Sequence, residues 1–504
     1  MSVSTRARSA GAPPESETPA PEALARQPAE TPAPDQPSAT DRQAPVRIAV
    51  LGAGGRGAEA YGRWFVANPE HGRVVAVAEL VDFKRDAFAD RAGVPRANRF
   101  ADWRELFAEA DRLALDAVVV ALPDADHLEP TVAAARIGAA VLLEKPIAPN
   151  EDALRDLEQQ LEALSPRVVV AHVLRETPFW RAVHRVTSSG ALGDLVTIRL
   201  EENIGFWHFA HSYVRGNWRR TDISSPMVLA KTSHDLDIIR WLADEPPVDV
   251  SSVGSLRHFH EGNAPEGAPS HCVKGCPAAA TCPFYAPRYY VDALSDVQGW
   301  PVTLLGPDVT PAGRLRALET SPYGRCVYKS DNDVVDHQQS VFAFPSGLTA
   351  SLTTSAFTGA NTRTFQITGT RGELSGHMED GELRLELFSP APTLVGDLAP
   401  DEDPSVPGWL DAGADLRTTT TGPLGHPVHE WRVLPEGVDD GAYNGHGGGD
   451  AALARRFVNA VRSENFDANV TTTLTASLDS HWMAFAAERS RLGRTTVQLD
   501  DVRQ

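Results

Sequence analysis

The chain has 504 residues, of which 42% are hydrophobic and 23% are charged, and its formal net charge is −20 at pH 7. This length suits two domains with a large core, and the composition is that of an ordinary globular protein. The acidic balance disfavours nucleic acid or an anionic membrane surface as a partner, and no apolar run is long enough to span a membrane. Four cysteines in so long a chain argue against a disulfide scaffold, so we expect a cytoplasmic protein.

Residues 1–45 differ in composition from everything that follows. They are rich in Pro, Ala, Glu, Ser and Thr and contain almost no large apolar side chain. Such a segment cannot bury enough surface to offset the entropy lost on ordering, so we predict a disordered tail. It also lacks the apolar core of a signal peptide.

The stretch 46–57, VRIAVLGAGGRG, joins a short apolar run to a G-x-G-x-x-G array. The run predicts a buried strand, and the residues from Ala58 onward predict a helix. In this context Gly52 allows a tight turn, Gly54 lets the backbone approach a pyrophosphate, and Gly57 lets the helix pack close to the strand. The helix N-terminus offers N–H groups to the phosphates. The residues expected to contact a dinucleotide are therefore Gly52, Ala53, Gly54, Gly55, Arg56 and Gly57.

A second apolar run, 74–78, ends at Glu79, about twenty residues beyond the glycines. A carboxylate at this position accepts hydrogen bonds from the adenosine ribose and repels a 2′-phosphate, which favours NAD. Lys84 and Arg85 follow closely and could serve a 2′-phosphate, so NADP stays open.

After Glu79, predicted helices alternate with short apolar strands at 117–122 and 140–143. This alternation predicts a doubly wound parallel sheet with right-handed crossovers. Ligands of such sheets bind at the carboxyl ends of the strands. The residues after these two strands are therefore expected to contact the cofactor: Leu122, Pro123, His127, Glu144, Lys145 and Pro146.

These motifs resemble those of the glucose–fructose oxidoreductase/inositol dehydrogenase (Gfo/Idh/MocA) family. The glycine array, Leu122-Pro123 with His127 and Glu144-Lys145-Pro146 carry the resemblance, together with HVLR at 172–175 and KTSHDLD at 231–237. The resemblance implies an NAD(P)-binding Rossmann domain, 46–168, and an α/β domain, 169–504, with a large, mostly antiparallel open sheet. It also implies a homo-oligomer (dimer or tetramer) and a sugar, cyclitol or derivative bound between this sheet and the nicotinamide.

The resemblance makes the chain an NAD(P)-dependent oxidoreductase, and three residues are candidates for handling the hydroxyl proton. Lys145 leaves a buried strand toward the expected crevice, where desolvation lowers the pKa of a lysine, and the matching lysine of the family contacts nicotinamide and substrate. Residues 225–242 predict one amphipathic helix on which Lys231 and His234 share a face. His234 suits proton removal from a carbinol. A surface role for Lys145 and a core or N-cap role for His234 are the alternatives.

The sequence departs from the sugar-dehydrogenase members of the family at Ala230. Those members carry Asp four residues before the matching histidine, so their Asp–Lys–His relay cannot be transferred whole. Asp235 or Asp237 could orient His234 instead. An NAD-dependent glycosidase that recycles its cofactor therefore stays open as an alternative, and a nucleotide-binding scaffold without catalysis is the third possibility.

Residues 201–220 combine aromatic, histidine and arginine side chains. Stacking rings beside hydrogen-bonding groups suit a carbohydrate-like ligand, whereas simple packing is the alternative. A glycine-rich loop at 445–449 precedes a predicted helix and could bring His446 to the substrate, with an Asp450 N-cap as the alternative. The candidate substrate residues are Arg175, Trp207, His208, His211, Arg215, Trp218, Asp235 and His446.

The four cysteines lie in a turn-rich insert at about 258–330. Thiolates so spaced can close a tetrahedral structural zinc site, with Cys272, Cys276, Cys282 and the more distant Cys326 as ligands. The spacing C-x3-C-x5-C is not a standard zinc or iron–sulfur motif, so free thiols are the alternative. Beyond the insert, alternating residues from 334 predict antiparallel strands, 385–440 a surface excursion, and 476–492 a final helix.

Overall fold

The structure is a computed structural model that describes residues 44–164, 166–389, 414–433 and 446–504. The predicted disordered tail lies outside the described residues except for its last two, 44 and 45. Residues 45–504 form one compact unit. Among the residues described, no helix combines the length and the apolar character needed to cross a membrane.

Six parallel strands form the first sheet, sheet A, in the order β3-β2-β1-β4-β5-β6. The sheet is doubly wound, as predicted, and its strand order reverses between β1 and β4, the point at which sheets of this kind bind their ligands. Its strands are β1 Val46–Leu51, β2 Gly72–Ala78, β3 Arg99–Phe100, β4 Ala117–Val120, β5 Ala140–Leu143 and β6 Val168–Val170.

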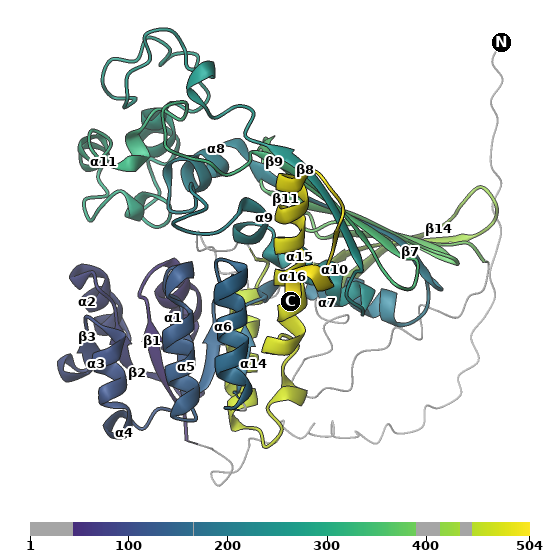
Figure 1. The fold of residues 1–504 in the computed structure, drawn as a ribbon, viewed down its shortest axis with the longest axis horizontal. Helices are drawn as coiled ribbons and strands as arrows, with labels where there is room; N and C mark the ends of the chain where they lie inside the picture. The colour runs from purple at the N-terminus through teal and green to yellow at the C-terminus, as the bar shows by residue number, and fades with distance from the viewer. Residues whose placement is uncertain (1–43, 165, 390–413, 434–445) are drawn as a thin grey trace, which may run out of the picture. The chain divides into compact units, whose positions relative to one another are not determined.

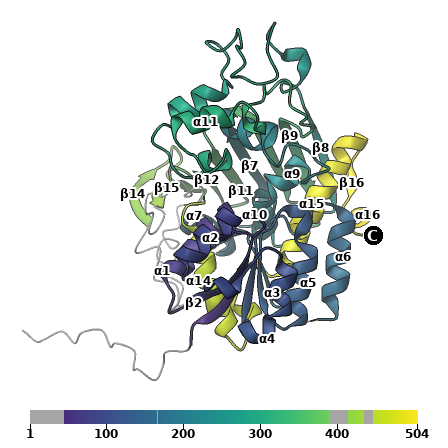
Figure 2. The same cartoon turned by 90° about the vertical axis from the view of Figure 1, so that its left-hand side faces the viewer.

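Sheet A is buried on both faces because its apolar residues alternate between two cores. Ala49 and Leu51 pack with α5 and α6, whereas Ile48 and Val50 pack with α1, α2 and α14. Figure 2 shows these helices on either side of the sheet. Helix α14 therefore returns from far along the chain to complete the nucleotide-domain core. The helices are α1 Gly62–Ala67, α2 Asp82–Arg91, α3 Trp103–Ala108, α4 Ala110–Leu113, α5 Leu128–Arg136, α6 Glu151–Glu162 and α14 Gly449–Arg462.

Ten strands form sheet B, in the order β14-β15-β13-β12-β11-β7-β10-β9-β8-β16. Only β7 and β10 pair in parallel among these strands, so the large, mostly antiparallel sheet is confirmed. The strands are β7 Leu195–Gly205, β8 Asp249–Ser255, β9 His337–Ala343, β10 Thr349–Thr358, β11 Thr362–Gly369, β12 Gly372–His377, β13 Glu382–Leu387, β14 Ala414–Thr421, β15 Pro427–Val433 and β16 Val497–Gln498. The prediction of a surface excursion over 385–440 was wrong where β14 and β15 extend the sheet.

Helices α7, α10 and α15 cover one face of sheet B (Figure 1). The remaining described helices of this half are short. The elements are α7 Pro178–Ser188, α8 Phe206–Phe209, α9 Met227–Ala230, α10 Ser233–Ala243, α11 Pro311–Ala317, α15 Leu474–Gly493 and α16 Asp500–Arg503.

The prediction of a single helix over 225–242 was wrong, because the helix is interrupted between α9 and α10. Thr232 leaves the helical conformation, with φ −104° and ψ 16°, and its hydroxyl donates to the carbonyl of Val228 at 2.5 Å. A threonine that bonds its own backbone competes with helix continuation. Lys231 therefore lies in the break and not on one continuous helix face with His234.

Candidate active site

The glycine loop follows β1 at the carboxyl edge of sheet A and passes into a π-helical turn, Gly55–Tyr61. Gly52 has a φ of +89°, and a Cβ there would lie 2.3 Å from the Ala121 carbonyl oxygen. A Cβ on Gly57 would lie 1.9 Å from the Gly52 carbonyl oxygen, whereas a Cβ on Gly54 would meet no atom within 4 Å. The first and third glycines are thus required by the fold, and the second borders open space where a phosphate could approach.

Glu79 follows β2 and points its carboxylate back at this loop. One oxygen accepts from the backbone N–H of Ala53 at 2.8 Å, and the other accepts from Val81 at 2.9 Å. The Arg85 guanidinium donates to the Glu79 carbonyl at 3.0 Å and pairs with Asp82. The acid therefore stands beside the glycines, as a ribose-binding residue must.

Arg56, the one charged residue of the glycine array, anchors a buried network. Its guanidinium contacts the carboxylates of Glu144 at 2.5 Å and Asp450 at 2.6 Å, and the Tyr61 hydroxyl donates to Glu144 at 2.6 Å. Burial tends to raise the pKa of Glu144, but Arg56 and the Tyr61 hydroxyl outweigh it and lower this pKa. Helix α14 begins at Gly449 with Gly448 as N-cap, so Asp450 is not the cap and instead pairs with Arg56.

The turn after β4 and the turn after β5 are tied together by His127. Its buried ring contacts the Leu122 carbonyl at 3.0 Å and the Pro146 carbonyl at 2.8 Å. Pro123, between them, is exposed. The bridge fixes the chain on both sides of Lys145.

Lys145 follows β5, and its Nζ donates to the Ala230 carbonyl at 3.0 Å. Burial lowers its pKa to about 8, with Glu144 opposing the shift and Lys231 adding to it. An amine with this pKa exchanges protons near neutral pH, which a general base or acid requires. Ala230 thus contacts the lysine through its backbone carbonyl.

Lys231 belongs to a buried charge network on sheet B. Its Nζ lies 2.6 Å from the carboxylate of Glu202 on β7, and Arg363 on β11 contacts both Glu202, at 2.8 Å, and Asp235, at 2.9 Å. Glu202 and Arg363 face each other in the strand register. Neither was predicted from the sequence; the only signal for Glu202 was a charged residue at an inward position of an alternating strand.

His234 opens α10 and lies between two other histidines. Its ring centroid is 5.9 Å from that of His172 and 5.3 Å from that of His446. Burial first, then the charge of Lys145, lowers its pKa well below the ordinary value, so the ring is neutral. Neither ring nitrogen has a hydrogen-bond partner among the described residues. Buried polar atoms are rarely left unpaired, so these two nitrogens are available to a ligand.

Neither acid proposed from sequence orients His234. Asp235 pairs with Arg363, and Asp237 forms a two-point pair with Arg175 at 2.7 and 2.6 Å. His446 instead lies beside the His234 ring and contacts Asp450 at 3.2 Å. The loop before α14 therefore reaches the site from the far end of the chain.

Two stretches within the first 284 residues of the chain match models of one family. Residues 46–172 match the oxidoreductase family with an NAD-binding Rossmann fold, GFO_IDH_MocA, and residues 180–284 match the GFO/IDH/MocA C-terminal domain. This chain belongs to the Gfo/Idh/MocA family.

Several similar proteins are named inositol 2-dehydrogenase. Inositol 2-dehydrogenase of Corynebacterium glutamicum is 31% identical over 221 residues, which are 42% of this chain and 60% of that protein. The enzyme of the same name from Rubrobacter xylanophilus is 32% identical over 41% of this chain and 54% of its own length. The matched segment thus spans little more than half the length of these relatives.

Solved structures share the fold. Levoglucosan dehydrogenase, in complex with NADH and levoglucosan, has a TM-score of 0.61 at 17% identity and covers 90% of this chain and 99% of its own. An NAD-binding oxidoreductase from Klebsiella pneumoniae has a TM-score of 0.59 at 16% identity, over 91% and 99% of the two chains. At these identities the likeness speaks for the fold of this Gfo/Idh/MocA chain alone.

The aromatic segment 206–218 of this family member packs largely on the cysteine-rich insert. Trp207 stacks on Tyr289 with ring centroids 5.7 Å apart, and His211 contacts the Tyr290 hydroxyl at 2.6 Å. Trp218 is partly exposed and lies near Tyr213. These contacts correspond to the packing alternative.

His208 and Arg215, in the same segment, have different surroundings. His208 contacts Asn361 at 3.0 Å, and burial together with the charge of Lys231 lowers its pKa to about 4. Arg215 is buried and donates to the carbonyls of Arg325 and Phe284. His208 is therefore beside the charge network of the site, and Arg215 lies within the insert.

Arg175 holds a structural position in this Gfo/Idh/MocA chain. Its guanidinium is bound by Asp237 and by the Thr471 carbonyl at 2.9 Å. We expect Asp237→Ala to lower the free energy of unfolding by about 3–5 kcal/mol, because the arginine would stay buried without its counter-charge. Urea denaturation measures this loss. The matched control is Asp152→Ala, which breaks an exposed pair with Arg155 and should cost less than about 0.5 kcal/mol; equal losses in the two variants would contradict the prediction.

The predicted zinc site is not supported. All four cysteines are free thiols, and the described residues contain no group of three or more His, Cys, Asp or Glu side chains that could hold a metal ion.

Proposed function

We propose that this chain is an NAD-dependent oxidoreductase that moves a hydride between nicotinamide and a carbinol carbon of a sugar, cyclitol or related derivative. The observation that carries the proposal is one juxtaposition. Lys145, with its lowered pKa, follows β5 at the carboxyl edge of sheet A, and its charge acts on His234, whose two ring nitrogens have no hydrogen-bond partner among the described residues. The glycine loop lies at the carboxyl end of a strand of the same sheet.

The fit of a dinucleotide to this edge is supported by the open space at Gly54 and by Glu79 beside the loop. The glycine-loop backbone would hold the pyrophosphate, and the Glu79 carboxylate would accept from the ribose hydroxyls. When bound, the nicotinamide supplies the hydride acceptor or donor.

Three residues of the chain would bind the substrate and transfer its proton. Neutral Lys145 would accept the hydroxyl proton as the alcohol is oxidised and would return it when the carbonyl is reduced. Neutral His234 would hydrogen-bond the same oxygen or its neighbour and so fix the carbinol carbon. Lys231, paired with Glu202, would present a positive charge to a second hydroxyl. A polyol offers several hydroxyls, as the names of the inositol and levoglucosan dehydrogenases suggest.

Calorimetric titration with NAD⁺, NADH, NADP⁺ and NADPH, followed by assays of NADH formation with myo-inositol and levoglucosan, tests the proposal. We expect NAD(H) to bind and a polyol to be oxidised. Nucleotide retained through purification, with no net NADH formed, would point to the glycosidase alternative. Absence of binding to all four nucleotides would overturn the oxidoreductase proposal and leave a scaffold.

Glu79 is expected to set the preference for NAD. Replacing it with alanine removes a charged acceptor worth about 1.5–3 kcal/mol, so the Kd for NAD⁺ should rise about tenfold or more. Binding of NADP⁺ should improve relative to NAD⁺, since the repulsion of the 2′-phosphate is lost. Titration of Glu79→Ala with both nucleotides measures this change, and Glu105→Gln on α3 is the control. An unchanged ratio of the two affinities would contradict the assignment.

We also infer a homo-oligomer. Three apolar residues of sheet B are exposed: Val196 on β7, Val253 on β8 and Val341 on β9. Exposed apolar side chains on a sheet suit contact with a second copy. Light scattering of the purified chain tests the subunit number, and a monomer would contradict the inference.

A further inference from the structure

Helix α15 carries a buried histidine, His481, that is bound to the turn after β5. The ring of His481 is fully buried, and its Nε2 accepts the backbone N–H of Ile147 at 2.8 Å. Ile147 stands two residues after Lys145 in the chain. The two hydrogen-bonded residues are 334 positions apart, so no local pattern of the sequence links them.

The hydrogen bonds of His481 fix the state of its ring. Nδ1 lies 3.0 Å from the Ser477 carbonyl, which can only accept, so Nδ1 carries the proton. Nε2 is then a lone pair, and the Ile147 N–H is its donor. Burial first, then His172, lowers the pKa of His481 to about 3, so the ring is neutral near pH 7. The bond to Ile147 is therefore a constant feature of the protein and not a switch.

Two buried histidines hold successive backbone groups of the turn. His127 contacts the Pro146 carbonyl at 2.8 Å, and His481 accepts the N–H of the next residue, Ile147. Backbone polar groups that are removed from water need such partners. His127 lies in the nucleotide domain, whereas His481 comes from the far end of the chain. The turn that carries Lys145 is therefore held by both halves of the chain.

Helix α15 is attached to both sheets. Thr473, its N-cap, forms a backbone bridge with Val169 of β6. Near the other end of the helix, the Ser490 hydroxyl accepts the backbone N–H of Ser252 on β8 at 2.8 Å. Between these points α15 packs against α10, the helix that His234 opens. The turn after β5 and the candidate histidine of α10 are thus held by the same helix.

We propose that His481 is a positioning residue for hydride transfer: by accepting the Ile147 N–H, it fixes the Lys145 amine relative to His234. Both ring nitrogens of His481 are bonded within the protein, so His481 acts through the turn and not on the substrate. The inference rests on the proposed function, in which Lys145 exchanges the hydroxyl proton. A displacement of about 1 Å at a reacting group can cost about 10²-fold in rate, so the position of this turn matters.

The first measurement follows the amine itself, without substrate or nucleotide. An amine-reactive anhydride labels Lys145 in its neutral form, and mass spectrometry of the peptide gives the labelling rate at each pH. We expect the rate of the wild-type chain to reach half its maximum near pH 8. In His481→Leu the turn is released and the amine reaches water, so this midpoint should rise by at least about one pH unit toward that of an ordinary lysine.

Two matched variants separate the bond from the helix. His481→Gln keeps a side-chain oxygen that can accept the Ile147 N–H, so it should keep the wild-type midpoint. Ser490→Ala, on the same helix, also removes the acceptor of a buried backbone N–H, but one on β8 and not in the turn, so it too should keep the midpoint. The charges that act on Lys145 are the same in all these variants, so a changed midpoint reports a changed position of the amine. They belong to Glu144, Lys231, Asp124 and Arg56.

The second measurement is polyol oxidation by the same preparations, together with calorimetric binding of NAD⁺. In His481→Leu we expect kcat to fall about 10- to 100-fold, because the amine is misplaced. KM and the Kd for NAD⁺ should stay within about threefold of the wild type, since neither reports the position of the amine. The pH at which kcat/KM levels off should rise with the labelling midpoint. His481→Gln should recover most of the lost kcat.

Equal midpoints in His481→Leu and the wild type would overturn the inference, as would a shift in Ser490→Ala as large as that in His481→Leu. Circular dichroism shows whether His481→Leu folds. If it does not, His481→Asn takes its place, because its shorter amide is polar but ends short of Ile147; equal midpoints in the Asn and Gln variants would then overturn the inference. A wild-type chain that binds no nucleotide would instead overturn the proposed function, and the labelling would still decide whether His481 places the amine.

Discussion

Replacing Lys145 with methionine is expected to lower kcat/KM for polyol oxidation by about 10²–10⁴-fold, the usual contribution of a positioned acid–base group. Methionine retains the length of the side chain and removes a partly buried amine, so the variant should fold. NADH formation with the substrate found in the screen measures the loss. Lys84→Met, which removes a lysine from α2, is the control and should stay within a few-fold of the wild type.

The pH dependence identifies the group. Burial lowers the pKa of Lys145 to about 8, so the neutral amine that accepts a proton predominates above this pH. For alcohol oxidation kcat/KM should therefore rise with pH and level off above about 8, and for carbonyl reduction, which needs the ammonium, it should fall there. The pKa of His234 lies well below its ordinary value, so titration of His234 cannot produce this change in kcat/KM. If Lys145→Met showed the same pH dependence of kcat/KM as the wild type, the base would be another group.

Two substitutions in the glycine loop should separate binding from folding. Gly54→Ala places a methyl group in open space, at an extended backbone angle that any residue adopts, so stability should not change. The same methyl group would occupy the approach of the pyrophosphate, and we expect the Kd for NAD⁺ to rise at least about tenfold. Thermal unfolding and calorimetry measure the two quantities. Gly299→Ala, also in open space but in the insert, is the matched control.

Gly57→Ala, in contrast, should lower the stability of the protein. Its Cβ would lie 1.9 Å from the Gly52 carbonyl oxygen, and the Gly52 backbone and the Val50 side chain leave little room to shift. The variant should lose about 1–3 kcal/mol of stability or fail to fold. A stable Gly57→Ala, or a Gly54→Ala with unchanged NAD⁺ affinity, would show that the loop is an ordinary strand-to-helix turn.

Local chemistry explains what could be predicted of the site. The glycine loop, Glu79 and Lys145 each follow a short apolar strand, and the carboxyl ends of parallel strands meet at one edge, so sequence order alone brings them together. The partners of these residues come from elsewhere. Helix α14 supplies Asp450 to Arg56, and β11 supplies Arg363 to Glu202. Pairings across hundreds of residues have no local pattern, which is why Asp235 and Asp237 were assigned to His234 and not to their arginines.

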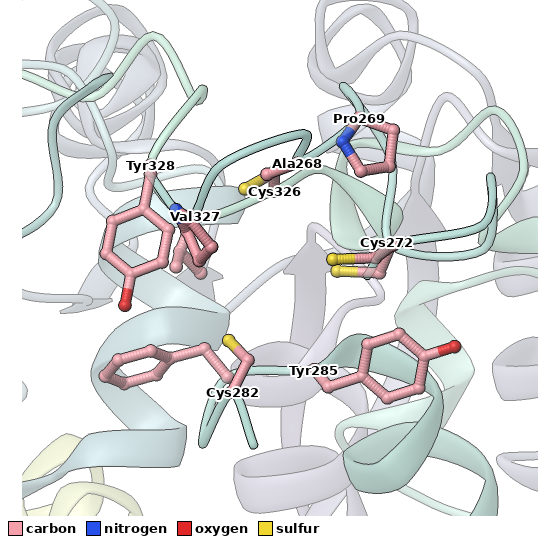
Figure 3. Close-up of a pocket in the computed structure, with 11 residues that line it drawn as sticks. Ala268, Pro269, Cys272, Cys282, Tyr285, Cys326, Val327 and Tyr328 are labelled. Atoms are coloured by element: carbon pink, nitrogen blue, oxygen red, sulfur yellow. The ribbon is translucent and has the colours of Figure 1, made fainter. Parts of the chain in front are cut away.

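The sequence by itself determined the parallel nucleotide-binding sheet and the antiparallel strands that follow it, because strand periodicity and glycine geometry are properties of neighbouring residues. The resemblance to the family rested on the motifs at the ends of those strands. Only the tertiary structure decided three further points. It interrupted the helix at Thr232, it turned Arg175 and Arg215 toward buried carbonyls and carboxylates, and it gathered four cysteines around one small cavity (Figure 3). Each depends on which distant backbone a side chain meets, and burial makes that partner obligatory.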